Sequence, residues 1–358
     1  MKKKLTNLLK FTVFLGVGVG ILYLVYQNQN AAYQEDCQLK GIAAADCQLI
    51  DKVIDDFTRV NYFWVGMILL AFVISNISRT VRWKMLLKPL GYNPRFINAF
   101  FSIILAYFAN LGLPRIGEVV RAGSLAKYEK IPVEKVMGTI VTDRIIDVIS
   151  ILIVTGLALF FAKDVIWLFF KENAHIGAKI DSLSTLMLYF GGAALVFAGL
   201  FFAFKRQIVK TKLYQKIIHI IIGFAEGIKS ILQLDKPWLF VLHSINIWLM
   251  YFLMTYFGFL TFGPTAGLPL VAALVVFVFG SWGIVIPSPG GMGTYHFLVG
   301  LALGIYGVNA ADGFSWANIV FFSIQLGCNI LIGIIALLAL PVINSKYEPV
   351  HHSKIAIQ

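Results

Sequence analysis

Long apolar runs, separated by short polar segments, set the pattern of this chain. A helix needs about 20 mostly apolar residues to cross a hydrocarbon core that is roughly 30 Å thick. Runs that predict crossing helices cover residues 8–26, 62–77, 136–161, 183–204, 237–262 and 314–343. The pattern predicts an all-α fold, a polytopic bundle of transmembrane helices.

Two further apolar runs are interrupted by helix breakers. The first, 96–130, contains Gly112 and Pro114, and a basic block follows the break. A full crossing would place that block outside, whereas a re-entrant hairpin inserted from the cytoplasmic side keeps it inside. Irregular backbone at that depth is tolerated where protein or water meets it. An ordinary span with a positive outer loop is the alternative.

The second interrupted run, 270–306, is broken by the Pro- and Gly-rich segment 287–293. If both flanking spans keep their expected directions, this unit makes no net crossing, and we expect a hairpin inserted from outside. Span, hairpin and span then occur twice, in 62–161 and 237–343, in opposite orientations. Such an order is typical of an inverted-topology repeat, in which broken helices form a site near the membrane midplane.

Composition agrees with membrane insertion. Hydrophobic residues make up 59% of the chain, charged residues 13%, and the mean hydropathy is +0.80. Soluble domains are about 45–50% apolar and about 25% charged. The formal net charge of +12 comes from short basic blocks between apolar runs. This distribution favours contact with anionic lipid headgroups over nucleic-acid binding.

The placement of charge predicts the orientation. The loop 27–61 is rich in Asp and Glu, whereas Arg79, Arg82 and further basic residues follow the run that ends at residue 77. By the positive-inside rule the loop lies outside and the basic flank lies in the cytoplasm, with both termini cytoplasmic. We expect a multi-pass protein of the cell (inner) membrane. The first run is interpreted as an uncleaved span, with a cleaved signal peptide as the alternative.

Three regions follow from this reading. The N-terminal span and its external loop cover 1–61. The transmembrane domain covers 62–343, and the cytoplasmic tail covers 344–358. Within the domain, 205–236 is basic and carries isoleucines at helical spacing, which predicts an amphipathic helix on the cytoplasmic leaflet. A solvated linker helix is the alternative. In the external loop, Cys37 and Cys47 either close a disulfide or remain free thiols.

The first candidate site follows the break at Pro114. Arg115, Glu118 and Arg121 are spaced i, i+3 and i+6, so on a helix Glu118 lies between the two arginines. Ionisable groups inside a membrane are costly and usually mark a pathway or a bound ion. Two arginines with one glutamate leave a net positive site, which suits a phosphate. Alternatively, all three side chains lie at the interface and reach water.

A second cluster, Asp143, Arg144 and Asp147, lies near the start of the following span. Asp143 and Asp147 are four residues apart and share one helix face. Two interpretations stay open. One is a structural ion pair that holds the first hairpin against the span, and the other is contact with a substrate or a proton.

The second interrupted run adds candidates without side-chain charge. Pro287, Gly290, Gly291 and Gly293 give backbone freedom, and backbone N–H groups of a glycine-rich turn can approach an anion. His296 follows, and a histidine can change charge near neutral pH, which suits a substrate or proton role. A hydrogen-bonded packing histidine is the alternative.

Other chemistries find no support in the sequence. It contains no GxxxxGK[ST] phosphate loop, no HExxH, no GxSxG and no CxxC. We therefore expect a protein that is not an enzyme and uses no cofactor or metal. Any transport is expected to be passive or driven by an ion gradient.

Four blocks of the sequence match one family in order. They are Arg79-x-x-Arg82-Trp83, Asn110-x-x-Leu113-Pro114-Arg115-x-Gly117-Glu118-x-x-Arg121, Asp143-Arg144-x-x-Asp147 and Pro287-x-Pro289-Gly290-Gly291-x-Gly293. Together they resemble the flippase-like family of the lysylphosphatidylglycerol synthase transmembrane region, in a stand-alone member that lacks the aminoacyl-transferase domain. The chain departs from the family pattern at His296, where many members are acidic, and at Asp143, where glutamate is common. These departures leave the substrate and proton coupling open.

The resemblance implies a lipid flippase or transporter that moves an anionic phospholipid or a lipid-linked headgroup across the membrane. One alternative is a lipid-binding accessory protein of envelope synthesis that transports nothing. Another is an ion-coupled transporter of small anions. The expected partners are membrane phospholipids and envelope-synthesis proteins, and nucleic acid is not among them.

Overall fold

The computed structural model describes residues 19–38 with single-residue gaps, and then 47–112, 115–165, 233–286 and 288–349. The predicted span at 183–204 lies outside these residues. So do most of the predicted amphipathic helix and the start of the first apolar run.

Every regular element of the described residues is helical, which confirms the predicted all-α membrane fold. The α-helices are α2 (Leu49–Thr58), α3 (Tyr62–Leu87), α4 (Phe96–Gly112), α5 (Gly117–Glu129), α6 (Val133–Phe161), α10 (Pro237–Thr261), α11 (Gly263–Ala266), α12 (Leu270–Val285), α13 (Thr294–Ile305), α14 (Ala310–Phe321) and α15 (Leu331–Ile343). Two short 3-10 helices, η2 (Lys88–Leu90) and η3 (Pro289–Gly291), and one π-helix, η4 (Phe322–Ile330), complete the set.

Four helical segments of the described chain are long and apolar enough to cross a membrane. They cover 62–90, 133–161, 237–261 and 310–343, the last running through α14, η4 and α15. These segments match the predicted runs, with one correction. The apolar run of α3 was expected to end at residue 77, but the helix continues to Leu87. Arg79 and Arg82, in this continuation of the helix, are buried in the bundle.

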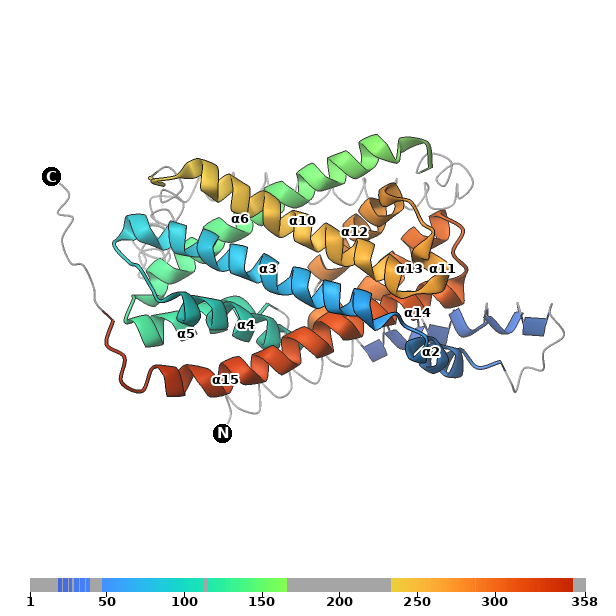
Figure 1. Ribbon diagram of the computed structural model, residues 1–358, viewed down its shortest axis with the longest axis horizontal. Coiled ribbons are helices and arrows are strands. Elements are labelled where there is room, and N and C mark those ends of the chain that lie inside the picture. The colour runs from blue at the N-terminus through green and yellow to red at the C-terminus, as the bar shows by residue number, and fades with distance from the viewer. Residues whose placement is uncertain are drawn as a thin grey trace, which may run out of the picture.

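The two interrupted runs form two helical hairpins, α4–α5 and α12–α13 (Figure 1). The hairpins occupy opposite halves of the long axis, and the chain enters them from opposite ends of the molecule. Each hairpin stands between two long segments, α3 and α6 in the first case and α10 and α14–α15 in the second. The order of elements is therefore that of the predicted inverted repeat. Re-entry of the hairpins into a membrane stays a prediction.

Glycine brings the two arms of each hairpin into close contact. A Cβ on Gly117 would lie 2.3 Å from the carbonyl oxygen of Ala106. The Gly117 N–H also donates to Asn110 Oδ1 at 2.7 Å, which links the start of α5 to the end of α4. In the second hairpin, a Cβ on Gly283 would lie 2.8 Å from the Cα of Tyr295. Only glycine permits such approach of one backbone to another.

The tips of the two hairpins meet inside the bundle. Gly290 in η3 has a φ of +60°, and a Cβ there would lie 3.0 Å from Leu111 of α4. The Gly290 carbonyl accepts a hydrogen bond from Gln325 Nε2 at 2.8 Å, which ties the second tip to η4. A π-helix inside a long helix often occurs at a functional position.

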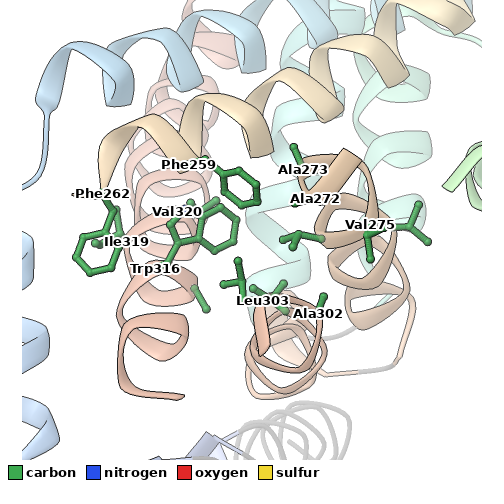
Figure 2. Packing of buried hydrophobic residues seen from close by; sticks show 14 of the residues in the cluster. Phe259, Phe262, Ala272, Ala273, Val275, Ala302, Leu303, Trp316, Ile319 and Val320 are labelled. Atoms are coloured by element: carbon green, nitrogen blue, oxygen red, sulfur yellow. The ribbon is translucent and has the colours of Figure 1, made fainter. Parts of the chain in front are cut away.

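Aromatic and small side chains pack α10, α12, α13 and α14 together (Figure 2). The rings of Phe259 and Trp316 meet edge to face with centroids 5.3 Å apart. Trp316 Nε1 donates to the Gly258 carbonyl at 2.7 Å, so the buried indole has a hydrogen-bond partner. Ala272 and Ala302 are fully buried and let the neighbouring helices approach. This core fixes the second hairpin.

A small cap closes the end of the bundle where α14 begins. Cys37 and Cys47 are joined by a disulfide. Lys52 of α2 forms an ion pair with Asp312 of α14 at 2.6 Å, and Leu49 of α2 packs with residues of α14 in one apolar cluster. The cap therefore attaches the predicted external loop to the second half of the chain.

The close contact at Gly258 makes a prediction. A Cβ there would lie 2.8 Å from Val320 and 2.9 Å from Trp316, so Gly258→Ala should lower the free energy of unfolding by about 1–3 kcal/mol through overpacking. Gly156→Ala is the matched control, because a Cβ on Gly156 meets nothing within 4 Å. Thermal unfolding of the two variants in detergent checks this. Equal Tm values would contradict the packing of α10 on α14.

Candidate functional site

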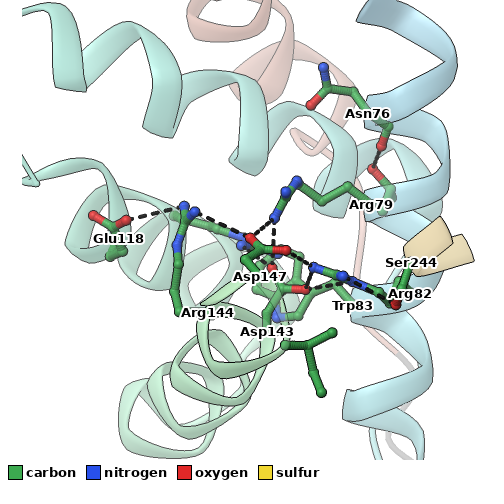
Figure 3. Close-up of polar contacts among 12 residues, drawn as sticks. Asn76, Arg79, Arg82, Trp83, Glu118, Asp143, Arg144, Asp147 and Ser244 are labelled. Atoms are coloured by element: carbon green, nitrogen blue, oxygen red, sulfur yellow. Dashed lines mark hydrogen bonds and ion pairs between the residues drawn. The ribbon is translucent and has the colours of Figure 1, made fainter. Parts of the chain in front are cut away.

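Seven charged side chains gather where α3, α5 and α6 meet (Figure 3). Helical spacing explains the convergence, because residues three or four apart share one face of a helix. Residues on α3 are three apart, and the two aspartates on α6 are four apart. The network consists of Arg79 and Arg82 of α3, Glu118 and Arg121 of α5, and Asp143, Arg144 and Asp147 of α6.

Asp143 is the centre of this network. Its carboxylate is fully buried and pairs with Arg82 at 2.6 Å, with Arg121 at 2.9 Å and with Arg79 at 3.2 Å. Three arginines from two other helices thus share one carboxylate of α6. A buried carboxylate would be very costly without partners. Asp143 therefore requires the arginines that surround it.

Asp147 repeats the arrangement one helical turn further along α6. It pairs with Arg82 at 2.7 Å and with Arg79 at 2.8 Å. A fourth helix, α10, contributes neutral oxygens: the Ser244 hydroxyl accepts from Arg82 at 3.2 Å, and the Tyr251 hydroxyl accepts from Arg79 at 3.2 Å. The two arginines of α3 therefore have carboxylates on one side and hydroxyls on the other.

Arg121 is held differently. Its guanidinium carbon lies 3.9 Å from the ring of Trp83, a cation–π contact. Nη1 donates to Asp143, but Nε and Nη2 are buried without a hydrogen-bond partner in the described part of the chain. The Trp83 ring is itself oriented by a 2.9 Å hydrogen bond from Nε1 to Thr139. Buried polar nitrogens of this kind call for an explanation, such as a bound anion or water.

The charges of the network do not balance. Four guanidinium groups face three carboxylates, which leaves one excess positive charge among these seven described residues. Arginine stays protonated under all ordinary conditions, so deprotonation of one of the four does not remove this excess. An anion bound at the network would neutralise it.

The outer edge of the network opens toward the side of the bundle. Arg144 pairs with Glu118 at 3.1 Å and with Asp147 at 3.5 Å. The side chains of Arg144 and Glu118 are 39% and 27% exposed, whereas those of Arg79, Arg82 and Arg121 are at most 3% exposed. The two partly exposed side chains line a pocket of about 320 Å³ between α5 and α6.

The expected triad of Arg115, Glu118 and Arg121 is not brought together. Helix α5 begins at Gly117, so Arg115 precedes the helix and the i, i+3 spacing does not apply to it. Arg115 has a φ of +63° and donates through Nη2 to the carbonyl of Val285 at 3.3 Å, at the C-terminal end of α12. A cation is favourable at such a helix end.

The candidates of the second half lie apart from the network. Pro287 is outside the described residues. Gly290, Gly291 and Gly293 have positive φ values and form the tip of the second hairpin. His296 is buried, with its ring 4.8 Å from that of Phe321. These residues pack with α12, α14 and η4, and the structure does not place them beside the arginines.

Arg79 and Arg82 are not among the site residues that the sequence predicts. They follow the predicted apolar run 62–77, and positive charge after a span is usually a topology signal. The spacing of charged residues on α3 and α6 also indicates that the two helices pair. Two arginines three apart on α3 complement two aspartates four apart on α6, and unpaired charges of both signs on neighbouring spans would be costly. Ser244 and Tyr251 carried no comparable signal.

The site does not resemble a metal centre. Within the described ranges, no group of three or more His, Cys, Asp or Glu side chains is placed to hold a metal ion. The carboxylates of the network face arginines instead. The chemistry that the arrangement favours is recognition of an anion by guanidinium groups.

The central carboxylate makes a prediction. Asp143→Asn should lower the free energy of unfolding by about 3–5 kcal/mol, because three arginines lose a shared buried partner. Asp55→Asn is the control, since Asp55 is 52% exposed in its pair with Arg59, and surface pairs contribute about 0–1 kcal/mol. Thermal unfolding in detergent measures both. Equal effects would contradict the central position of Asp143.

Comparison with known proteins identifies relatives. The profile of the family described as the lysylphosphatidylglycerol synthase TM region matches residues 46–333. The UPF0104 membrane protein MJ1595 of Methanocaldococcus jannaschii is 31% identical over 123 residues, which cover 34% of this chain and only about a third (34%) of that relative. The UPF0104 membrane protein PH1989 of Pyrococcus horikoshii is 26% identical over 235 residues, 60% of this chain and 69% of that relative. No solved structure matches the chain.

Proposed function

Because the chain belongs to the family of the lysylphosphatidylglycerol synthase transmembrane region, we propose that it is a flippase or transporter of an anionic phospholipid or a lipid-linked headgroup. The observation that carries the proposal is the buried network with one excess positive charge. A phosphate group supplies the missing negative charge, and arginine binds phosphate through two parallel hydrogen bonds.

The two hairpins support a transport role. They enter the bundle from opposite ends, and their tips meet at Leu111 and Gly290. Transporters built from inverted repeats form their sites where broken helices meet and open them alternately to the two sides. In this chain, α5 of the first hairpin is attached to α6 by two ion pairs, Arg121–Asp143 and Glu118–Arg144. A movement of the first hairpin exchanges these pairs, and a bound phosphate lowers the cost of the exchange.

The proposal also covers the location of the protein, its partners and the energy source of transport. The protein resides in the cell (inner) membrane with both termini in the cytoplasm, and membrane phospholipids are its partners. It catalyses no covalent reaction and requires no cofactor. Movement of the lipid follows its own gradient or is coupled to an ion gradient. The apolar helices support residence in a membrane, and the acidic composition of the loop 27–61 supports the orientation.

Lipid movement in proteoliposomes tests the function. The vesicles hold phosphatidylglycerol with a fluorescent label, and a membrane-impermeant quencher reports the label that reaches the outer leaflet. We expect the native protein to accelerate this transfer. Arg121→Gln should slow it at least tenfold, a loss of about 1.4 kcal/mol or more, because the excess charge is removed. Arg59→Gln is the matched control, because Arg59 is 73% exposed and pairs only with Asp55 in the described chain.

The outcomes separate the alternatives. A folded Arg121→Gln protein that moves the lipid at the native rate would refute the site. Native protein that binds phosphatidylglycerol but does not move it would support an accessory role in envelope synthesis. Uptake of labelled inorganic phosphate without lipid movement would support a transporter of small anions.

A further inference from the structure

We propose that the pocket between α5 and α6 admits a lipid phosphodiester sideways from the membrane, and that Glu118 is a built-in anion which the phosphate displaces from Arg144. The inference rests on the proposed function for the identity of the ligand as the transported lipid. It adds the place where the lipid first binds and the side chain that competes with it.

The shape of the pocket suits a lipid. Its volume is about 320 Å³, and it is lined by Glu118 and Arg144 together with apolar side chains of α6. Among the apolar residues, Ile145, Val148 and Ile149 are 40%, 56% and 48% exposed. Because α6 is one of the membrane-spanning candidates, these exposed apolar side chains are suited to contact with hydrocarbon. The wall of the pocket is therefore apolar throughout, and the charged ends of Glu118 and Arg144 lie behind it, toward the bundle.

Arg144 is the arginine of the network that a ligand can reach from the side of the bundle, because its side chain is 39% exposed, whereas that of Arg121, with two unpartnered nitrogens, is 1% exposed. Its pair with Asp147 is long, at 3.5 Å, and its Nε has no hydrogen-bond partner in the described residues. By contrast, Arg82 makes two short ion pairs, at 2.6 and 2.7 Å, and is fully buried. The excess positive charge of the network is therefore accessible only at its outer edge.

Glu118 occupies the position of an anionic ligand. One carboxylate oxygen, Oε1, lies 3.1 Å from Arg144 Nη2, while Oε2 is buried and has no partner in the described chain. A carboxylate and a phosphodiester each carry one negative charge and two oxygens that match a guanidinium fork. One phosphodiester also neutralises the single excess charge of the seven side chains, so the complex is electrically balanced without loss of any proton.

The apolar wall favours a lipid over free phosphate. Inorganic phosphate would have to leave water completely to enter a pocket with an apolar wall, and it has no apolar part to contact that wall. A lipid in the bilayer already has its acyl chains against α6, so only its headgroup has to move toward Arg144. The phosphate of a membrane lipid is therefore the ligand that the pocket fits.

Binding of short-chain lipids to the purified full chain tests the inference. The probes are dioctanoyl phosphatidylglycerol, dioctanoylglycerol and glycerol 3-phosphate, titrated by calorimetry in detergent. We expect Glu118→Gln to bind the phosphatidylglycerol about fivefold to tenfold more tightly, because Arg144 is released from its competitor. Arg144→Gln should weaken binding at least tenfold. Dioctanoylglycerol lacks the phosphate and glycerol 3-phosphate lacks the acyl chains, so both should bind far more weakly than dioctanoyl phosphatidylglycerol.

The control variant removes one negative charge, as Glu118→Gln does, but outside the pocket. Glu134 is exposed in the first turn of α6, so Glu134→Gln changes the net charge without touching the pocket and should leave the affinity unchanged. If Arg144→Gln does not fold, Arg144→Lys replaces it. It keeps the charge, loses the planar fork and should still weaken binding several-fold.

Several results would overturn the inference. One is a folded Glu118→Gln protein that binds phosphatidylglycerol no more tightly than the native chain. Another is equal binding of dioctanoylglycerol or of glycerol 3-phosphate. The proposed function fails separately. If Glu118→Gln gains affinity but the native protein moves no lipid in vesicles, the binding site stands and the transport role does not. Lipid movement without any gain in affinity leaves transport intact and removes the role of Glu118.

Discussion

The ion pairs of one buried carboxylate hold this bundle together. Asp143 accepts from arginines of α3 and α5, so a single side chain of α6 connects the first long helix, the first hairpin and the second long helix. In a medium of low dielectric constant such pairs cannot be exchanged for water, which makes each partner obligatory. The arrangement also carries an excess of positive charge, which a bound anion would neutralise.

Much of the architecture follows from the sequence. The lengths of the apolar runs predict α6, α10 and the α14–α15 segment to within a few residues, because hydrocarbon thickness fixes helix length. The breakers near residues 113 and 290 predict both hairpins. The family blocks also contain every charged residue of the network, although the sequence did not show which of them pair.

The errors have physical causes. Arg115 was grouped with Glu118 and Arg121 by spacing, but spacing has meaning only within one continuous helix, and α5 begins two residues later. The burial of Arg79 in an ion-pair network was not predicted, because the rule for positive charge ignores acidic residues on other helices. Long-range pairing of this kind depends on tertiary structure. The pocket was equally beyond sequence analysis, because it requires the relative placement of two helices.

The bond from Arg115 to the carbonyl of Val285 joins the turn of one repeat to the helix end of the other. Two repeats that touched only through side-chain packing could tilt independently of each other. A hydrogen bond from the Arg115 side chain to the C-terminal end of α12 opposes such independent movement. A tilt of the first hairpin away from α12 therefore breaks this bond, so the two halves of the chain are mechanically coupled at the point where their breaks lie.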